Sequence, residues 1–117
     1  MPVPVNIERL HLITGEDPEA QRELIELFLD DTGQRMRRLE EALVARNWAL
    51  MGIEAHTVKG ASSNMGADSL QVAIALLEKA VKGQQAPEIQ PLLEKARLEF
   101  LHTADFFLDY LKTLPEG

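Results

Sequence analysis

The chain has 117 residues, of which 45% are hydrophobic and 26% charged, and its formal net charge is −7. This length and apolar content predict one soluble globular domain over residues 1–117, with a single modest core. The negative charge disfavours general nucleic-acid binding, because basic surface supplies most of the affinity for phosphate backbones. The absence of cysteine excludes disulfides and zinc sites that depend on thiolates.

The N-terminal residues MPVPVNIERL contain no basic segment followed by an apolar run, so they do not resemble a signal peptide. No stretch approaches the roughly 20 apolar residues needed to cross a bilayer. We therefore expect a cytoplasmic protein without membrane insertion. The one basic cluster, Arg35 to Arg38, lies within an acidic helical segment, and we interpret it as a solvated face rather than a phosphate-binding patch.

The first half of the chain predicts two helices. Asn6 is a candidate N-cap and Gly15 a stop signal for a short N-terminal helix. Asp17, followed by Pro18, marks the start of a long second helix. The apolar face of that helix recurs at three- and four-residue spacing and consists of Ile25, Phe28, Leu29, Thr32, Met36, Leu39 and Leu43.

The second half predicts three more helices. One runs over about 48–65, and the next opens near Asp68 and ends at Gly83. The last begins between Pro87 and Pro91, and we expect Pro91 in its first turn, where proline is tolerated. Four substantial amphipathic helices with short connections predict an all-α fold, an antiparallel up-and-down four-helix bundle with a short additional N-terminal helix.

The third predicted helix carries a face of unusual composition. At about 100° per residue, with His56 at zero, Gly60 falls at about +40°, Gly52 at about −40°, Ser63 at about −20° and Lys59 at about −60°. His56 should therefore point away from the core, with a glycine one turn to either side. The predicted core stripe of this helix lies on another face and consists of Trp48, Met51, Ala55, Val58, Ser62 and Met65.

Glycine inside a helix costs roughly 1 kcal/mol relative to alanine, so Gly52 and Gly60 suggest that a missing side chain is useful. We interpret them as clearance that lets another macromolecule approach His56. An exposed imidazole is a nucleophile near neutral pH. Lys59 adds a cation that can pair with an anion attached to it. The alternative is an ordinary surface histidine with incidental glycines.

The segment AHTVKGASSNMGA resembles the motif of histidine-containing phosphotransfer (HPt) domains. In that family a histidine is followed, after two residues, by Lys-Gly, then by small residues and a glycine at the helix end. The flanking segments ITGEDPEAQRELIELFLDDT and LQVAIALLEKA resemble the neighbouring helices of the family, so the likeness covers nearly the whole chain. The residues that match the motif in order are His56, Lys59, Gly60, Ser62, Ser63, Gly66 and Ala67.

The resemblance implies an intermediate of a multistep two-component phosphorelay. His56 would accept a phosphoryl group on Nε2 from the aspartate of one receiver domain and pass it to another. The family often holds Nδ1–H with a Gln or Glu 22 positions later, which is Glu78 here. Alternatively, Glu78 forms an ordinary i, i+4 ion pair with Lys82. Lys59 would balance the charge of the phosphate.

The resemblance also implies a phosphocarrier rather than an autonomous enzyme, and the chain contains no nucleotide-binding motif. Its expected partners are response-regulator receiver domains and a hybrid sensor histidine kinase, with the chain itself a monomer. We expect no cofactor here, since the Mg²⁺ of the reaction belongs to the receiver. The candidate docking residues are Gly52, Ile53, Gly60 and Ser63 around the histidine. Further candidates are Ile7, Leu10, Leu12, Ile13 and Leu29, with the alternative that several of these belong to the core.

Two other functions remain open at this stage. The chain could be a four-helix protein-interaction module whose histidine is never phosphorylated. A metalloprotein is disfavoured, because His11, His56 and His102 are scattered and no HExxH or paired Glu-x-x-His motif is present. We therefore predict no metal site and interpret His11 and His102 as ordinary helix-face residues.

Overall fold

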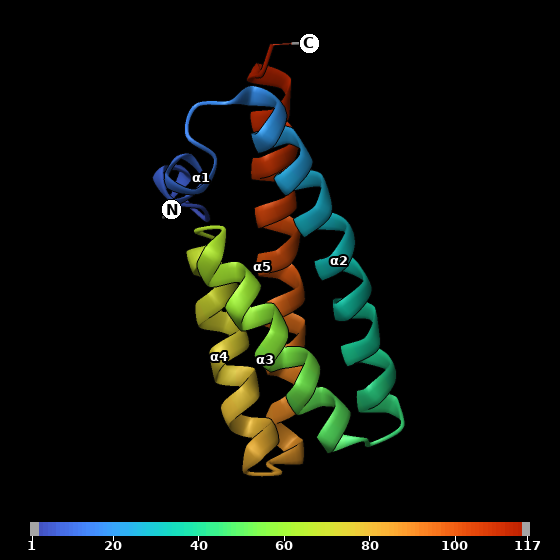
Figure 1. The fold of residues 1–117 in the computed structure, drawn as a ribbon. Coiled ribbons are helices and arrows are strands. Elements are labelled where there is room, and N and C mark those ends of the chain that lie inside the picture. The colour runs from blue at the N-terminus through green and yellow to red at the C-terminus, as the bar shows by residue number, and fades with distance from the viewer. Residues whose placement is uncertain (1–2, 116–117) are drawn as a thin grey trace.

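The structure, a computed structural model, describes residues 3–115. Within that range it consists of five α-helices and contains no strand: α1 (Ile7–Thr14), α2 (Pro18–Val44), α3 (Trp48–Asn64), α4 (Asp68–Lys82) and α5 (Ala86–Thr113). Helices α2 to α5 run alternately up and down an elongated molecule of 46 × 26 × 20 Å (Figure 1). The predicted antiparallel four-helix bundle with a short additional N-terminal helix is therefore confirmed.

The helix starts follow the local signals in the sequence. The side chains of Asn6 and Asp17 accept hydrogen bonds from backbone N–H groups in the first turns of α1 and α2. Asn47 does the same for α3 by accepting from the N–H of Leu50. Such caps satisfy donors that have no partner within the helix, so each side chain fixes where its helix begins.

The start of α5 differs from the prediction. This helix begins at Ala86, so Pro91 lies in its second turn rather than its first. Proline has no N–H to donate to the carbonyl four residues earlier, which belongs to Pro87. Both prolines are exposed, so water can hydrate that carbonyl and the helix continues through Pro91.

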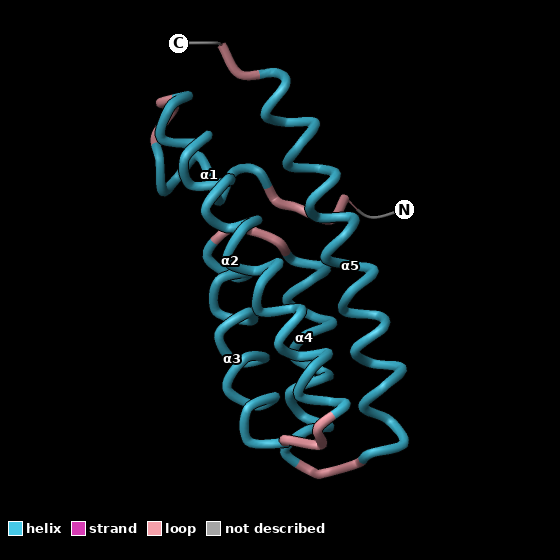
Figure 2. The backbone as a smooth tube through the Cα atoms, turned by 90° about the vertical axis from the view of Figure 1, so that its right-hand side faces the viewer, coloured by secondary structure: helices cyan, strands magenta, loops and turns pink. Residues whose placement is uncertain are grey.

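The four bundle helices differ in length, and the difference makes room for α1. Helices α2 and α5 have 27 and 28 residues, whereas α3 and α4 have 17 and 15. At 1.5 Å per residue, the long pair extends roughly 15–20 Å beyond the short pair. The excess emerges at one end of the bundle, where α1 lies across the ends of α3 and α4 (Figures 1 and 2).

The chain before α1 is held against the α3–α4 turn. The N–H of Asn6 donates to the carbonyl of Gly66 over 2.7 Å, and the N–H of Ser69 faces the carbonyl of Pro4 at 3.4 Å. Gly66 has a φ of +70°, and a Cβ at this position would collide with the backbone of Asn6. Only glycine therefore fits at the point where α3 ends and the N-terminal segment is seated.

The core lies between all four bundle helices and follows the predicted stripes. In α3 the predicted core residues are buried, except for Trp48, which is half-buried. Phe28 of α2 meets Phe107 of α5 edge to face, with ring centroids 5.8 Å apart. No helix within residues 3–115 combines the length and apolar content required to cross a membrane.

Candidate functional site

His56 lies in the middle of α3 and faces solvent, with 72% of its side chain exposed. A Cβ added at Gly52 or Gly60 would meet no heavy atom within 4 Å, so both glycines border open space. Ile53 and Ser63 are exposed on the same side of the helix. The structure thus places an accessible imidazole on a surface that a large partner can approach without steric obstruction.

Glu78 reaches His56 from the neighbouring helix α4. Its Oε2 lies 3.0 Å from Nδ1 of His56, although the residue itself is only 4% exposed. An ionised carboxylate can only accept a hydrogen bond, so Nδ1 must carry the hydrogen. In a neutral imidazole this leaves Nε2 as the nitrogen with a free electron pair. The geometry therefore selects the tautomer that is nucleophilic at Nε2.

Two lysines bind the same carboxylate. Nζ of Lys59 lies 2.5 Å from Oε1 of Glu78, and Nζ of Lys82 lies 3.7 Å from Oε2. The hydrogen bond from Lys59 is the main reason that the pKa of Glu78 lies below its ordinary value; the bond from His56 adds to this, while burial opposes it. The i, i+4 pair with Lys82 therefore coexists with the contact to His56, and the two interpretations of Glu78 are compatible.

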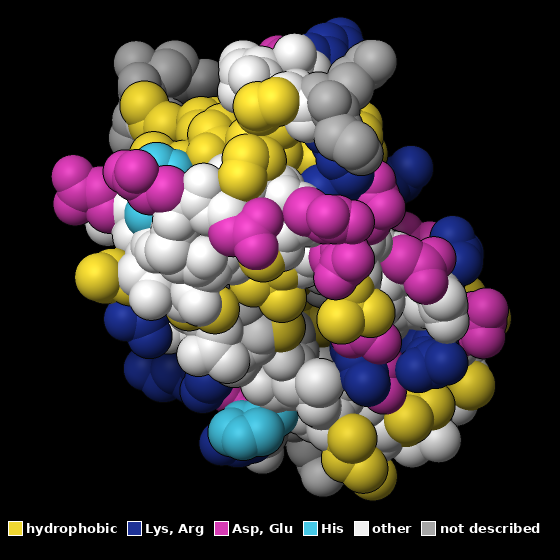
Figure 3. Space-filling model, turned by 45° about the horizontal axis from the view of Figure 1, so that its top comes forward, with side chains coloured by type: hydrophobic (Ala, Val, Ile, Leu, Met, Phe, Trp, Pro, Cys, Tyr) yellow, Lys and Arg dark blue, Asp and Glu magenta, His cyan; other side chains and the backbone are white. Residues whose placement is uncertain are grey.

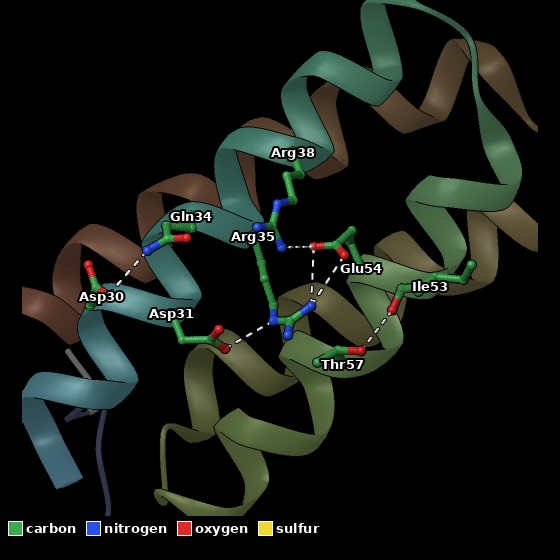
Figure 4. A network of polar contacts seen from close by, with 8 residues as sticks. All are labelled: Asp30, Asp31, Gln34, Arg35, Arg38, Ile53, Glu54 and Thr57. Carbon is green, nitrogen blue, oxygen red and sulfur yellow. Dashed lines mark hydrogen bonds and ion pairs between the residues drawn. The ribbon is translucent and has the colours of Figure 1, made fainter.

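The basic segment of α2 is only partly the solvated face that we predicted. Nε of Arg35 donates to Asp31 over 2.9 Å, and Nη1 of Arg35 donates to Glu54 over 3.2 Å (Figure 4). Nη1 of Arg38 lies 3.8 Å from the same carboxylate. The prediction holds for Arg37, which is exposed, and is wrong for Arg35, which joins α2 to α3.

Glu54 was missed by the sequence analysis. It is a buried carboxylate two residues before His56, and its partners Arg35 and Arg38 come from another helix. The signal available in the sequence was a glutamate on the core side of the predicted α3 wheel, which requires a cation for compensation. This ion pair fixes α3 against α2 on the side opposite the contact between His56 and α4.

The additional docking candidates fall into three groups. Leu10 is completely buried and cannot touch a partner, so that prediction is wrong; Leu10 is the residue through which α1 joins the core. Ile7 and Leu29 are half-buried against the core. Leu12 and Ile13 are exposed, Leu12 by 78%.

A groove of about 670 Å³ runs between α1, α2 and the C-terminal end of α3. It begins at Ala61, directly after Gly60, and continues past exposed Leu27, which the sequence analysis did not single out. On the face seen in Figure 3, apolar side chains are exposed among acidic and basic ones. The residues lining the groove are Arg9, Ile13, Leu24, Leu27, Phe28, Asp31, Thr32, Ala61, Asn64 and Met65.

The other two histidines have contacts of their own. Nδ1 of His102 lies 3.6 Å from Oε1 of Glu99, one turn away on α5, as expected of a helix-face residue. Nε2 of His11 lies 3.0 Å from the hydroxyl of Tyr110 on α5, so the same interpretation is wrong for His11. In the part of the chain that the structure describes, no three His, Cys, Asp or Glu side chains form a group suited to a metal ion.

Comparison with known proteins places this geometry in context. Residues 23–113 match the model of the Hpt domain family. Histidine-containing phosphotransfer protein B (HptB) from Pseudomonas aeruginosa PAO1 is 24% identical, with a TM-score of 0.90 over 98% of this chain and 100% of that chain. A comparison with curated proteins finds no match.

Two further solved structures have the same fold. A putative histidine-containing phosphotransfer protein from rice is 18% identical, with a TM-score of 0.84 over 93% of this chain and 80% of that one. The HPT domain of a sensor hybrid histidine kinase from Shewanella is 19% identical, with a TM-score of 0.80 over 97% of both chains. The family match spans most of the sequence, so the chain belongs to the Hpt domain family and is an intermediate of a phosphorelay.

Proposed function

We propose that His56 is the phosphorylated residue and that the chain carries the phosphoryl group between receiver domains. The observation that carries this proposal is an exposed imidazole whose Nδ1 is held by the buried carboxylate of Glu78. Exposure gives a receiver access to Nε2, and the hydrogen bond fixes the ring and its tautomer before the partner arrives.

The transfer is a displacement at phosphorus. The electron pair of Nε2 attacks the aspartyl phosphate of the donor receiver, the P–N bond forms, and the P–O bond breaks to release the aspartate carboxylate. The ring keeps its Nδ1 hydrogen and gains positive charge, which the carboxylate of Glu78 stabilises. Attack by the aspartate of a second receiver reverses these steps and restores the neutral imidazole.

Lys59 is suited to stabilising the phosphorylated state. A phosphoryl group adds a charge of roughly −2 at neutral pH, by analogy with other phosphorylated side chains. The flexible side chain of Lys59 lies on the same face as His56 and is paired with Glu78, so it can turn toward the new anion while Lys82 stays near the carboxylate. We expect Lys59 to assist transfer without being essential.

Docking would use the surface around the histidine, which consists of Gly52, Ile53, Gly60 and Ser63. The groove that begins at Ala61 extends this surface toward α1. We propose that residues 1–117 form one domain that acts as a cytoplasmic, monomeric phosphocarrier, with receivers and a hybrid sensor kinase as its partners. Such a carrier needs no cofactor or catalytic activity of its own, because the receiver supplies the acidic pocket and its Mg²⁺.

The test is transfer from a phosphorylated receiver in the presence of Mg²⁺. We expect the wild-type chain to acquire an acid-labile, base-stable label, and the variant His56→Gln to acquire none. His102→Gln is the matched control and should be labelled normally. Label on His56→Gln would place the phosphoryl group elsewhere, while receiver binding without any label would favour an interaction module.

A further inference from the structure

Helix α1 forms one wall of the groove, but little apolar packing holds it in place. Among its eight residues, Leu10 is the one that is fully buried, while Leu12 and Ile13 are exposed. Its N-terminal end is held by the hydrogen bond from Asn6 to Gly66. Leu10 and half-buried Ile7 pack against the core and limit the rotation of α1. This packed area is small, so a further contact on another side of the helix adds to the definition of where Ile13 lies.

A chain of hydrogen bonds on the other side of α1 provides that contact. The amide nitrogen of Gln21 on α2 donates to the carbonyl of Gly15 over 3.3 Å, which leaves Oε1 of Gln21 facing the other way. The hydroxyl of Tyr110 on α5 donates to that oxygen over 2.8 Å. A phenol has one hydrogen, so the oxygen of Tyr110 must accept from Nε2–H of His11, 3.0 Å away.

Each donor and acceptor in this chain thus has one consistent assignment. The path leaves α1 at His11, passes through α5 and α2, and returns to Gly15, the C-terminal cap of α1. Gln21 is buried and Tyr110 half-buried, and burial raises the pKa of Tyr110, so the phenol keeps its hydrogen. Loss of one of these hydrogen bonds would leave a polar atom that is shielded from water without a partner, and this would lower the stability of the folded state.

The hydrogen-bonded residue and the groove residue lie on different sides of α1. Relative to buried Leu10, helix geometry places His11 at about +100° and Ile13 at about −60°. The bond to Tyr110 therefore restrains the rotation of α1, and that rotation sets where Ile13 lies along the groove that Leu27 also lines.

We propose that His11, Tyr110 and Gln21 are positioning residues for receiver docking. They hold α1 so that its groove side contacts the receiver, and they take no part in the phosphoryl chemistry at His56. This inference rests on the proposed function. Helix α1 and Gln21 lie outside residues 23–113, the segment that matches the family model, whereas Tyr110 lies within it.

The test separates docking from chemistry with the variant Tyr110→Phe, which removes only the hydroxyl. Phosphoramidate phosphorylates histidine without a docking partner, so its labelling rate at His56 should stay within about twofold of wild type. The Kd for a phosphorylated receiver should rise about three- to tenfold, the change expected from one lost hydrogen bond. Hydrogen exchange of the α1 amides should become faster.

Two further variants show whether the residues act as a unit. His11→Ala should reproduce the effect of Tyr110→Phe, and the double variant should be little worse than either single one. His102→Ala, which alters a histidine outside this network, is the control and should keep the wild-type Kd.

An unchanged receiver Kd in Tyr110→Phe overturns the inference, as does a loss of phosphoramidate labelling or an equal effect in the control. Failure of the proposed function is a different result: the wild-type chain itself would acquire no label from receivers. In that case the α1 exchange rates in Tyr110→Phe still decide whether the tether exists, and unchanged rates would refute it.

Discussion

Two clusters, each containing a histidine, join helices in this protein. They differ in which nitrogen of the imidazole is bonded and in the chemistry of its partner. At His56 a buried carboxylate binds Nδ1 while the rest of the ring stands in solvent. At His11 a neutral phenol binds Nε2, and the ring bridges α1 to α5. Glu78 binds His56 through Nδ1 and leaves Nε2 accessible to solvent. In His11, Nε2 itself forms the contact between the helices. The bonded nitrogen and the charge of its partner therefore distinguish the histidine that we propose to be phosphorylated from the one that joins two helices.

We expect the largest effect when each of the two histidines is replaced in turn with glutamine. His56→Gln should abolish receiver-dependent labelling because no nucleophilic nitrogen remains, and its circular dichroism should match wild type because the side chain is exposed. His11→Gln should retain labelling, with weaker receiver binding. Labelling is measured by acid-labile radioactivity. A loss of helicity in His56→Gln would show that this histidine is structural as well.

The second test removes the carboxylate that binds the ring of His56. Glu78→Ala should slow receiver-dependent transfer by about 10- to 100-fold, by analogy with the range typical when the orienting partner of a metal-binding histidine is lost. Glu78→Gln should be less impaired, because its amide oxygen can still accept from Nδ1–H. Rapid-quench measurement of single-turnover transfer distinguishes the two variants. Equal rates in Glu78→Ala and wild type would mean that ring orientation does not limit transfer.

The third test concerns the open space beside the ring of His56. Gly60→Leu should reduce receiver-dependent transfer about tenfold by obstructing the partner, yet raise the free energy of unfolding by up to roughly 1 kcal/mol through helix propensity. Gly33→Ala is the matched control: it faces Phe100 at ordinary contact distance, so it should be tolerated without slowing transfer. Urea unfolding and transfer kinetics are compared for both. Normal transfer in Gly60→Leu would contradict the clearance argument.

The smallest expected effect is a pH dependence that belongs to one cluster only. The folded-state pKa of Glu78 is lowered from its ordinary value of 4.5, chiefly by Lys59, so the ionised carboxylate stabilises the folded state above pH 4.5. That stabilisation is lost as the pH falls through the lowered pKa. The Tm difference between wild type and Glu78→Gln should therefore shrink below pH 4.5.

The comparison for this pH series is Tyr110→Phe. Its cluster contains no carboxylate, so its Tm difference from wild type should stay constant over the same acidic range. Parallel behaviour of the two variants would show that the ionic character of the His56 cluster does not affect stability.

Much of the His56 cluster could be anticipated from the sequence because its information is local. Helix periodicity placed His56 opposite the buried stripe, and the spacing of Gly52 and Gly60 marked the open face on either side of it. The contact to Glu78 came from the family resemblance, and its cause is the side-by-side packing of two consecutive helices.

The remaining features depend on contacts between segments that are distant in the sequence. Glu54 finds Arg35 only once α2 and α3 pack together, and His11 finds Tyr110 99 positions later along the chain. The docking prediction fails for Leu10 because the eight residues of α1 give too little periodicity to separate the buried side of a helix from its exposed side. Pairing of helices, rather than their existence, is what the sequence did not reveal.

The unequal lengths of the bundle helices also fix the position of α1 along the bundle axis. Helix α1 lies across the ends of α3 and α4, so the part of α3 beyond His56 determines how far α1 and its wall of the groove lie from Nε2 of His56. One extra turn in the part of α3 beyond His56 would move α1 about 5.4 Å farther from His56, and no residue around His56 would change. A rigid receiver that contacts both His56 and α1 in the present molecule could then contact only one of the two. The number of turns in the short helices therefore sets the distance between His56 and α1.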